Sequence, residues 1–164
     1  MSGEERQLGL FPAGVDVSRC WHEAGHVVVA AACGFRVLGA EVDAHGGLTS
    51  FEHGSGKGWR ARVAMVLLAG HLAEKAAGFA GWSEGHGGAP DWEQALDVVL
   101  PLCLGTGDVV DLSPDFVAAV LDQCENRARA CLASRARWRA VGRVAAALAE
   151  RQRVSADDVH ALLA

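Results

Sequence analysis

The segment from Asp16 to Cys33 limits the fold of this chain most strongly, because its second half is apolar on every side. Asp16 and Ser18 are suitable N-cap residues, and Gly34 follows the segment, as glycine follows many helices. A helix without a polar face is stable only when it is buried. The sequence therefore predicts a helix at the centre of its domain, with its side chains rigidly held.

Around this helix the sequence predicts a mainly helical fold with one small β-hairpin. The hairpin is expected over 37–53, where two short β-prone runs flank His45-Gly46-Gly47. Apolar residues at helical spacing predict helices over 59–78, from about 90 to 104, from 113 to 132, over 134–150 and from 155 onward. Ser113 is expected to cap the fourth helix, and Ser155 to open a capping box. Glycine-rich segments predict a mobile loop over 78–90 and a turn over 105–107.

The 164 residues suit a single domain, and the sequence shows neither a repeat nor a linker. We expect a loose N-terminal segment over 1–17 and one folded domain over 18–164. The longest apolar run, Val27 to Cys33, falls far short of the roughly 20 residues that span a bilayer. We therefore expect no membrane segment.

The charge and the cysteines limit the classes of partner and compartment. The formal net charge of −5 argues against general binding to nucleic acids or to anionic membranes. The five cysteines are an odd number without CxxC spacing, which favours the reducing cytoplasm. They are expected to act as small core hydrophobes. The sequence does not predict the oligomeric state.

His22-Glu23-Ala24-Gly25-His26 is an HExxH pattern inside the central helix. The two histidines are one helical turn apart, so both imidazoles can converge on one ion while Glu23 projects beside it. Imidazole suits Zn²⁺, and a zinc position left to water lowers the pKa of that water. Glu23 is then the expected general base. The alternative is a pair of histidines that are satisfied by hydrogen bonds and hold no metal.

Two histidines leave a catalytic zinc one protein ligand short. Two downstream carboxylates are candidates: Glu74 in the predicted second helix, and Asp91 at the start of the third. On the residues alone, either can reach the ion.

In three places the sequence resembles the peptidase domain of the FtsH-type ATP-dependent zinc proteases, peptidase family M41. That family carries HEAGH followed by small and apolar residues, as here over Trp21–Val27. Its Gly-Gly-Arg-Ala-Ala-Glu segment is similar to Ala69–Glu74, and its Asn-Asp-Leu-x-x-Ala segment is similar to Pro90–Ala95. The resemblance covers most of the chain, with His71 and Pro90 as departures from the family pattern and with a shorter, more glycine-rich loop.

The resemblance implies that Asp91 is the third zinc ligand and that Glu74 orients a ligand or packs near the metal. It also implies a zinc metallopeptidase that acts on short or unfolded polypeptides. Family members normally also carry a membrane segment and an AAA ATPase, and neither fits before Ser18. We therefore expect a domain without its own ATPase, with a separate ATPase chain as the partner that would unfold proteins. The alternative function is a non-catalytic or regulatory interaction module that keeps this fold.

Overall fold

The structure is a computed structural model that describes residues 15–79, 88–103 and 113–164. The described part of the chain forms six helices and three short strands, which confirms the predicted fold class. In chain order the elements are α1 (Val17–Ala32), β1 (Arg36–Val42), β2 (Gly47–Glu52), α2 (Trp59–Ala76), α3 (Gly88–Cys103), α4 (Pro114–Leu132), α5 (Arg135–Arg151), β3 (Arg153–Ser155) and α6 (Ala156–Leu163).

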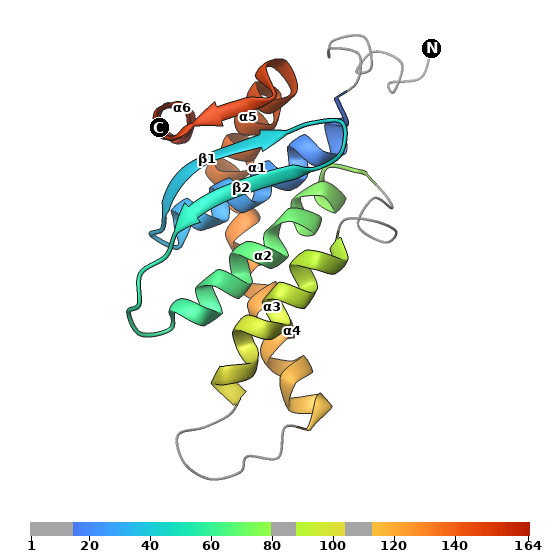
Figure 1. Cartoon of the computed structure of the whole chain (residues 1–164), viewed down its shortest axis with the longest axis vertical. Coiled ribbons are helices and arrows are strands. Elements are labelled where there is room, and N and C mark those ends of the chain that lie inside the picture. The colour runs from blue at the N-terminus through green and yellow to red at the C-terminus, as the bar shows by residue number, and fades with distance from the viewer. Residues whose placement is uncertain (1–14, 80–87, 104–112) are drawn as a thin grey trace.

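The predicted central helix is α1, and it is buried as expected. The Asp16 side chain caps it by accepting a hydrogen bond from the Ser18 main-chain nitrogen at 3.0 Å. The helix packs against the β1–β2 hairpin, α2 and α5 (Figure 1). At the crossing with α2, a Cβ on Gly25 would lie only 2.6 Å from the carbonyl oxygen of Ala69. Glycine therefore allows the two helices to approach closely.

The predicted hairpin is part of a three-stranded antiparallel sheet with the order β2-β1-β3. The third strand was not predicted, because it has only three residues and the last of them, Ser155, is also the N-cap of α6. Gly39 has a φ of 151°, and a Cβ there would lie 2.7 Å from the Val154 carbonyl oxygen. Glycine is thus required where β1 meets β3, and β2 and β3 are the two edge strands of the sheet.

Helix α2 contributes to two apolar clusters. One is the main core around α1, and the other lies against α3 and α4. Ala64 and Leu68 of α2 pack there against Ala95 and Val99 of α3 and against Leu121 of α4. This packing holds α3 beside α2, with its first turn close to α1. The relative position of α1 and α3 therefore depends on α2.

The ends of the helices agree with most of the predicted signals. Ser113 accepts a hydrogen bond from the Phe116 main-chain nitrogen at 3.2 Å, and Ser155 and Asp158 form the predicted capping box. Helix α3 begins at Gly88, earlier than the predicted start near Pro90. Proline is tolerated there because the nitrogens of a first helical turn have no intrahelical partner.

Several predictions concern segments outside the described residues. These are most of the N-terminal segment, the larger part of the loop over 78–90, and the turn over 105–107. Among the helices that the structure describes, none has the length and apolar character needed to span a bilayer.

Candidate metal centre

Helices α1 and α3 bring together the three predicted ligands, His22, His26 and Asp91. Oδ2 of Asp91 lies 2.8 Å from Nε2 of His22 and 3.3 Å from Nε2 of His26. The three ligand atoms all lie within 4.8 Å of one another. Both histidines are buried, and the Asp91 side chain is 21% exposed. A group with this composition and spacing could bind a metal ion.

Hydrogen bonds on the far edges of the two rings orient them. Nδ1 of His26 lies 2.7 Å from the Val66 carbonyl oxygen, and Nδ1 of His22 lies 3.4 Å from Oε2 of Glu74. A carbonyl oxygen only accepts, so His26 donates from Nδ1. In the neutral ring the lone pair is then on Nε2, which faces Asp91. The two rings meet edge to face, with their centroids 4.7 Å apart.

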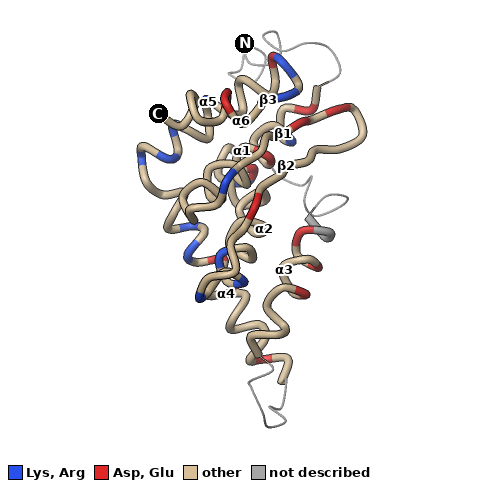
Figure 2. Tube along the Cα trace, turned by 60° about the vertical axis from the view of Figure 1, so that its left-hand side comes forward, with Lys and Arg blue, Asp and Glu red and all other residues tan. Residues whose placement is uncertain are grey.

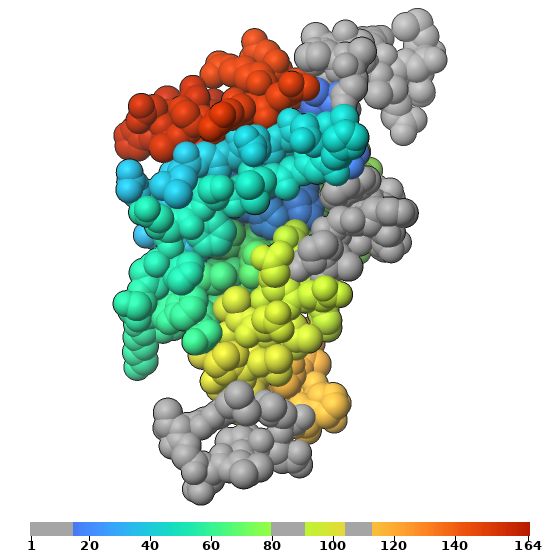
Figure 3. Space-filling model, viewed as in Figure 1, coloured from blue at the N-terminus to red at the C-terminus, as the bar shows by residue number. Residues whose placement is uncertain are grey.

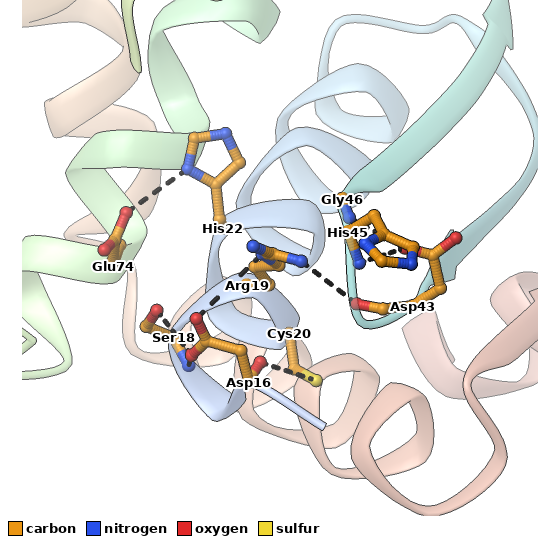
Figure 4. Close-up of polar contacts among 9 residues, drawn as sticks. All are labelled: Asp16, Ser18, Arg19, Cys20, His22, Asp43, His45, Gly46 and Glu74. Atoms are coloured by element: carbon orange, nitrogen blue, oxygen red, sulfur yellow. Dashed lines mark hydrogen bonds and ion pairs between the residues drawn. The ribbon is translucent and has the colours of Figure 1, made fainter. Parts of the chain in front are cut away.

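Glu74 contacts Nδ1 of His22 (Figure 4). Asp91 contacts Nε2, on the opposite edge of the same ring. The Glu74 side chain is 1% exposed, and its Oε1 has no hydrogen-bond partner among the described residues. Asp91 faces both Nε2 atoms, whereas Glu74 contacts only Nδ1 of His22. Of the two carboxylates that the sequence left open, Asp91 is therefore the one in the group that could bind a metal ion, and Glu74 contacts the far edge of His22.

Gly70 of α2 leaves the space that the two imidazoles occupy. A Cβ at this position would lie 2.5 Å from Nε2 of His22 and 2.5 Å from Nε2 of His26. Sequence reasoning did not single out Gly70 as a site residue. The available signal was a glycine inside a helix, which costs about 1 kcal/mol relative to alanine and so indicates a packing requirement.

Two of the separations among the ligand atoms are close to those around a small divalent ion. Two ligands of a tetrahedral zinc, each about 2.0–2.1 Å from the metal, lie roughly 3.3 Å apart. His26 and Asp91 already have this separation, and the 2.8 Å between His22 and Asp91 needs to open by only about half an ångström. A positive charge beside Asp91, on a protonated imidazole or on a metal ion, stabilises this arrangement.

The pKa values of His22 and Asp91 are shifted in opposite directions, and each shift favours the charged form. Burial opposes a charge on His22, but hydrogen bonds to Asp91 and Glu74 outweigh it and raise the pKa of His22 to about 9. Burial also opposes a charge on Asp91, but hydrogen bonds to His22 and His26 hold the pKa of Asp91 well below its usual range. The carboxylate is thus stabilised by a nearby positive charge, which a metal ion would equally supply.

Glu23 faces the same cavity as the three ligand residues. This cavity has a volume of about 560 Å³, with β2 and α3 as its walls and α1 and α2 at its base. In Figure 3 atoms of α1 are visible between the hairpin and α3. The Glu23 side chain is buried, and its Oε2 accepts a hydrogen bond from Oγ1 of Thr49 at 2.7 Å. Glu23 therefore lies at the base of a groove that is open to solvent.

Acidic side chains surround this groove. Figure 2 shows Asp and Glu along α3 and near the β1–β2 turn, whereas Arg residues gather along α5. Asp97 of α3 lies in the cavity wall beside the ligand residues. The groove therefore favours neutral or cationic ligands over anionic ones.

None of the other described histidines and none of the cysteines belongs to the metal group, although His45 lines the same cavity. His71 lines a different cavity, between α2, α4 and α5, and burial lowers its pKa. His53 stacks on Trp59, and His45 lies in the β1–β2 turn. The five cysteines are free thiols, and none belongs to the His22, His26 and Asp91 group in the described part of the chain. His86 lies outside the described residues.

No protein-family model matches this chain, and no curated protein sequence matches it significantly. The case for a function therefore depends on the geometry and chemistry of the site itself.

Proposed function

We propose that this chain is a zinc-dependent metallopeptidase of the FtsH-like type, with Zn²⁺ held by His22, His26 and Asp91. The observation that carries the proposal is the convergence of two imidazole Nε2 atoms and one carboxylate oxygen beside Glu23 in an open groove. Three protein ligands leave a fourth position of a tetrahedral zinc for water, as in catalytic rather than structural sites. The resemblance of the three sequence segments to peptidase family M41 supports the same function.

Glu23 has the chemistry that peptide hydrolysis requires. Zn²⁺, when bound, would polarise the scissile carbonyl and lower the pKa of a water molecule. Glu23 accepts a proton as the water oxygen attacks the carbonyl carbon, and it donates that proton to the leaving nitrogen as the C–N bond breaks. The hydrogen bond from Thr49 requires Glu23 to act as an acceptor, which suits an ionised general base.

The groove supports extended polypeptides as substrates. Because β2 is an edge strand of its sheet, its outer backbone groups are not paired with another of the described strands. An extended peptide can pair with such an edge. A cavity of about 560 Å³ holds a few residues but no folded domain, so we propose short or unfolded substrates, with a separate ATPase as the partner for folded ones. We propose the reducing cytoplasm as the location, because the number of cysteines is odd and none has CxxC spacing.

Glu23→Gln is the decisive variant, because it keeps the shape of the side chain and removes its basicity. With zinc-loaded protein and unfolded casein as substrate, we expect this variant to lose about 10²- to 10⁴-fold in kcat while zinc content stays unchanged. Glu93→Gln is the matched control, since Glu93 is exposed and lies outside the cavity lining. Cleavage at the wild-type rate by Glu23→Gln would overturn the proposal.

The same experiment separates the peptidase from a non-catalytic interaction module. Such a module would bind zinc but would show no casein cleavage that depends on Glu23. Zinc-loaded wild-type protein that leaves casein intact would therefore favour the module.

A further inference from the structure

The β2 strand contacts Glu23 at two alternate residues on the same face. Oγ1 of Thr49 lies 2.7 Å from Oε2 of Glu23 and 3.3 Å from the Glu23 carbonyl oxygen. A Cβ on Gly47 would overlap Oε1 of Glu23 and would lie 2.7 Å from its Cγ. Residues 47 and 49 share a face because side chains alternate along a strand. The hairpin thus covers the carboxylate with Gly47 and Thr49.

From these contacts we propose that Thr49 is a positioning residue for Glu23, an inference that rests on the proposed peptidase function. A hydroxyl group has a single hydrogen, and the shorter of the two distances assigns it to Oε2. With Oε2 held by this bond, Oε1 remains to receive the proton from the attacking water. Gly47 supports the arrangement because a larger residue would push the carboxylate away from this position.

The hairpin is itself attached to α1 close to Glu23. Arg19, one helical turn before Glu23, donates a hydrogen bond to the Asp43 carbonyl oxygen at 3.0 Å (Figure 4). The Asp43 carboxylate accepts hydrogen bonds from the main-chain nitrogens of His45 and Gly46, both at 2.7 Å, and these bonds lower its pKa. The turn is therefore closed and attached to the helix, so β2 keeps its register over Glu23.

The Thr49 hydroxyl can be removed without changing the size of the side chain. We expect zinc-loaded Thr49→Val to cleave casein with a kcat about 10- to 100-fold below wild type, as for residues that orient functional groups. Its KM and zinc content should stay within about twofold of wild type, because Thr49 is not among the residues that hold the ion. Thr49→Ser keeps the hydroxyl and should restore most of the activity.

Two further variants test the geometry. Ser134→Ala is the control, because it removes a hydroxyl at the start of α5, away from β2 and from the cavity lining, and it should leave kcat unchanged. Gly47→Ala should lower kcat with zinc retained, because the added methyl group displaces Glu23. Circular dichroism and thermal unfolding of each variant confirm that it is folded before its activity is compared.

The outcomes separate this inference from the proposed function. If wild-type protein cleaves casein and Thr49→Val cleaves it equally well, or if Thr49→Ser is as impaired as Thr49→Val, the positioning role is wrong and the peptidase function stands. Loss of zinc from Thr49→Val would also overturn the positioning role. If wild-type protein shows no Glu23-dependent cleavage, the proposed function fails and the role of Thr49 fails with it.

Discussion

Oδ2 of Asp91 lies 2.8 Å from Nε2 of His22, although 69 positions separate the two residues in the sequence. Helix α2 brings them together, because it packs against α1 on one side and against α3 on the other. Glu74, which belongs to α2 itself, reaches only the opposite edge of the same ring. The two carboxylates should therefore have different effects when they are replaced.

Asp91→Ala should abolish zinc binding, whereas Glu74→Gln should weaken it by about 10- to 100-fold, the usual effect of losing a group that orients a ligand. The measurements are zinc content by mass spectrometry after gel filtration, and affinity by competition with a chromophoric chelator. His26→Ala serves as the reference for a lost ligand. The assignment of the two carboxylates would be reversed if Glu74→Gln emptied the site while Asp91→Ala kept its zinc.

A chelator should lower the thermal stability of the zinc-loaded protein, because the ion would tie α1 to α3. Zinc at 100 times its Kd contributes about 2.7 kcal/mol to the free energy of unfolding. For a domain of this size, that corresponds to a decrease in Tm of roughly 5–10 °C on removal of the metal. Differential scanning fluorimetry with and without EDTA measures this effect. The Tm of Asp91→Ala should not change on addition of EDTA. If EDTA left the Tm of the wild-type protein unchanged, zinc binding between α1 and α3 would be contradicted.

Gly70→Ala should reduce zinc binding strongly, because the new methyl group would overlap Nε2 of both histidines. Gly142→Ala is the matched control in another helix, since its Cβ would meet only a Trp21 ring carbon at 3.7 Å, an ordinary contact. Alanine at 142 should stabilise the protein by about 0.5–1 kcal/mol through helix propensity. Zinc stoichiometry and chemical unfolding compare the two variants. Equal zinc content in both would disprove the role of Gly70.

Cys33 should react slowly with iodoacetamide in the folded protein. Burial, with a contribution from the neighbouring Cys131 thiol, raises the pKa of Cys33 to about 11. Since the thiolate is the reactive form, alkylation at pH 7.5 should be much slower than in urea, where the pKa returns to about 8.5. Peptide mass spectrometry over pH 7–10 follows the rate, which should increase with pH throughout. Similar rates in both states would contradict the raised pKa.

The raised pKa of Cys33 also makes the stability of the protein depend on pH. The pKa of Cys33 is higher in the folded than in the unfolded protein, so its contribution to stability is complete below about pH 8.5. That contribution is lost as the pH rises towards 11. Cys33→Ala should therefore reduce the alkaline sensitivity of chemical unfolding, and it should leave zinc binding unchanged.

Local sequence was sufficient for the features whose causes lie within one or two helical turns. Asp16 and Ser155 cap their helices as predicted, because a capping side chain bonds to a nitrogen two or three residues ahead. The pairing of His22 with His26 is of the same kind, since helix geometry alone places both on one face. These features depend on no other part of the chain.

The remaining features depend on residues that are distant in the sequence. β3 forms by pairing with the edge of β1. Gly39 is needed only because the Val154 carbonyl oxygen lies close to its Cα. The roles of Gly70 and Thr49 follow from which face of α2 and of β2 packs on α1, and no local pattern records that choice. These residues were therefore absent from the predicted site.

The helix that carries both imidazoles could be predicted from the sequence alone. Its N-cap hydrogen bond is local, and its second half, apolar on every side, is stable only when buried. Which carboxylate meets the imidazole Nε2 atoms could not be read in this way. Glu74 and Asp91 are both acidic and both on helices, and their distance from the rings depends on how α1, α2 and α3 pack. Long-range packing of apolar faces, rather than local pattern, placed Asp91 at the Nε2 atoms and Glu74 behind His22.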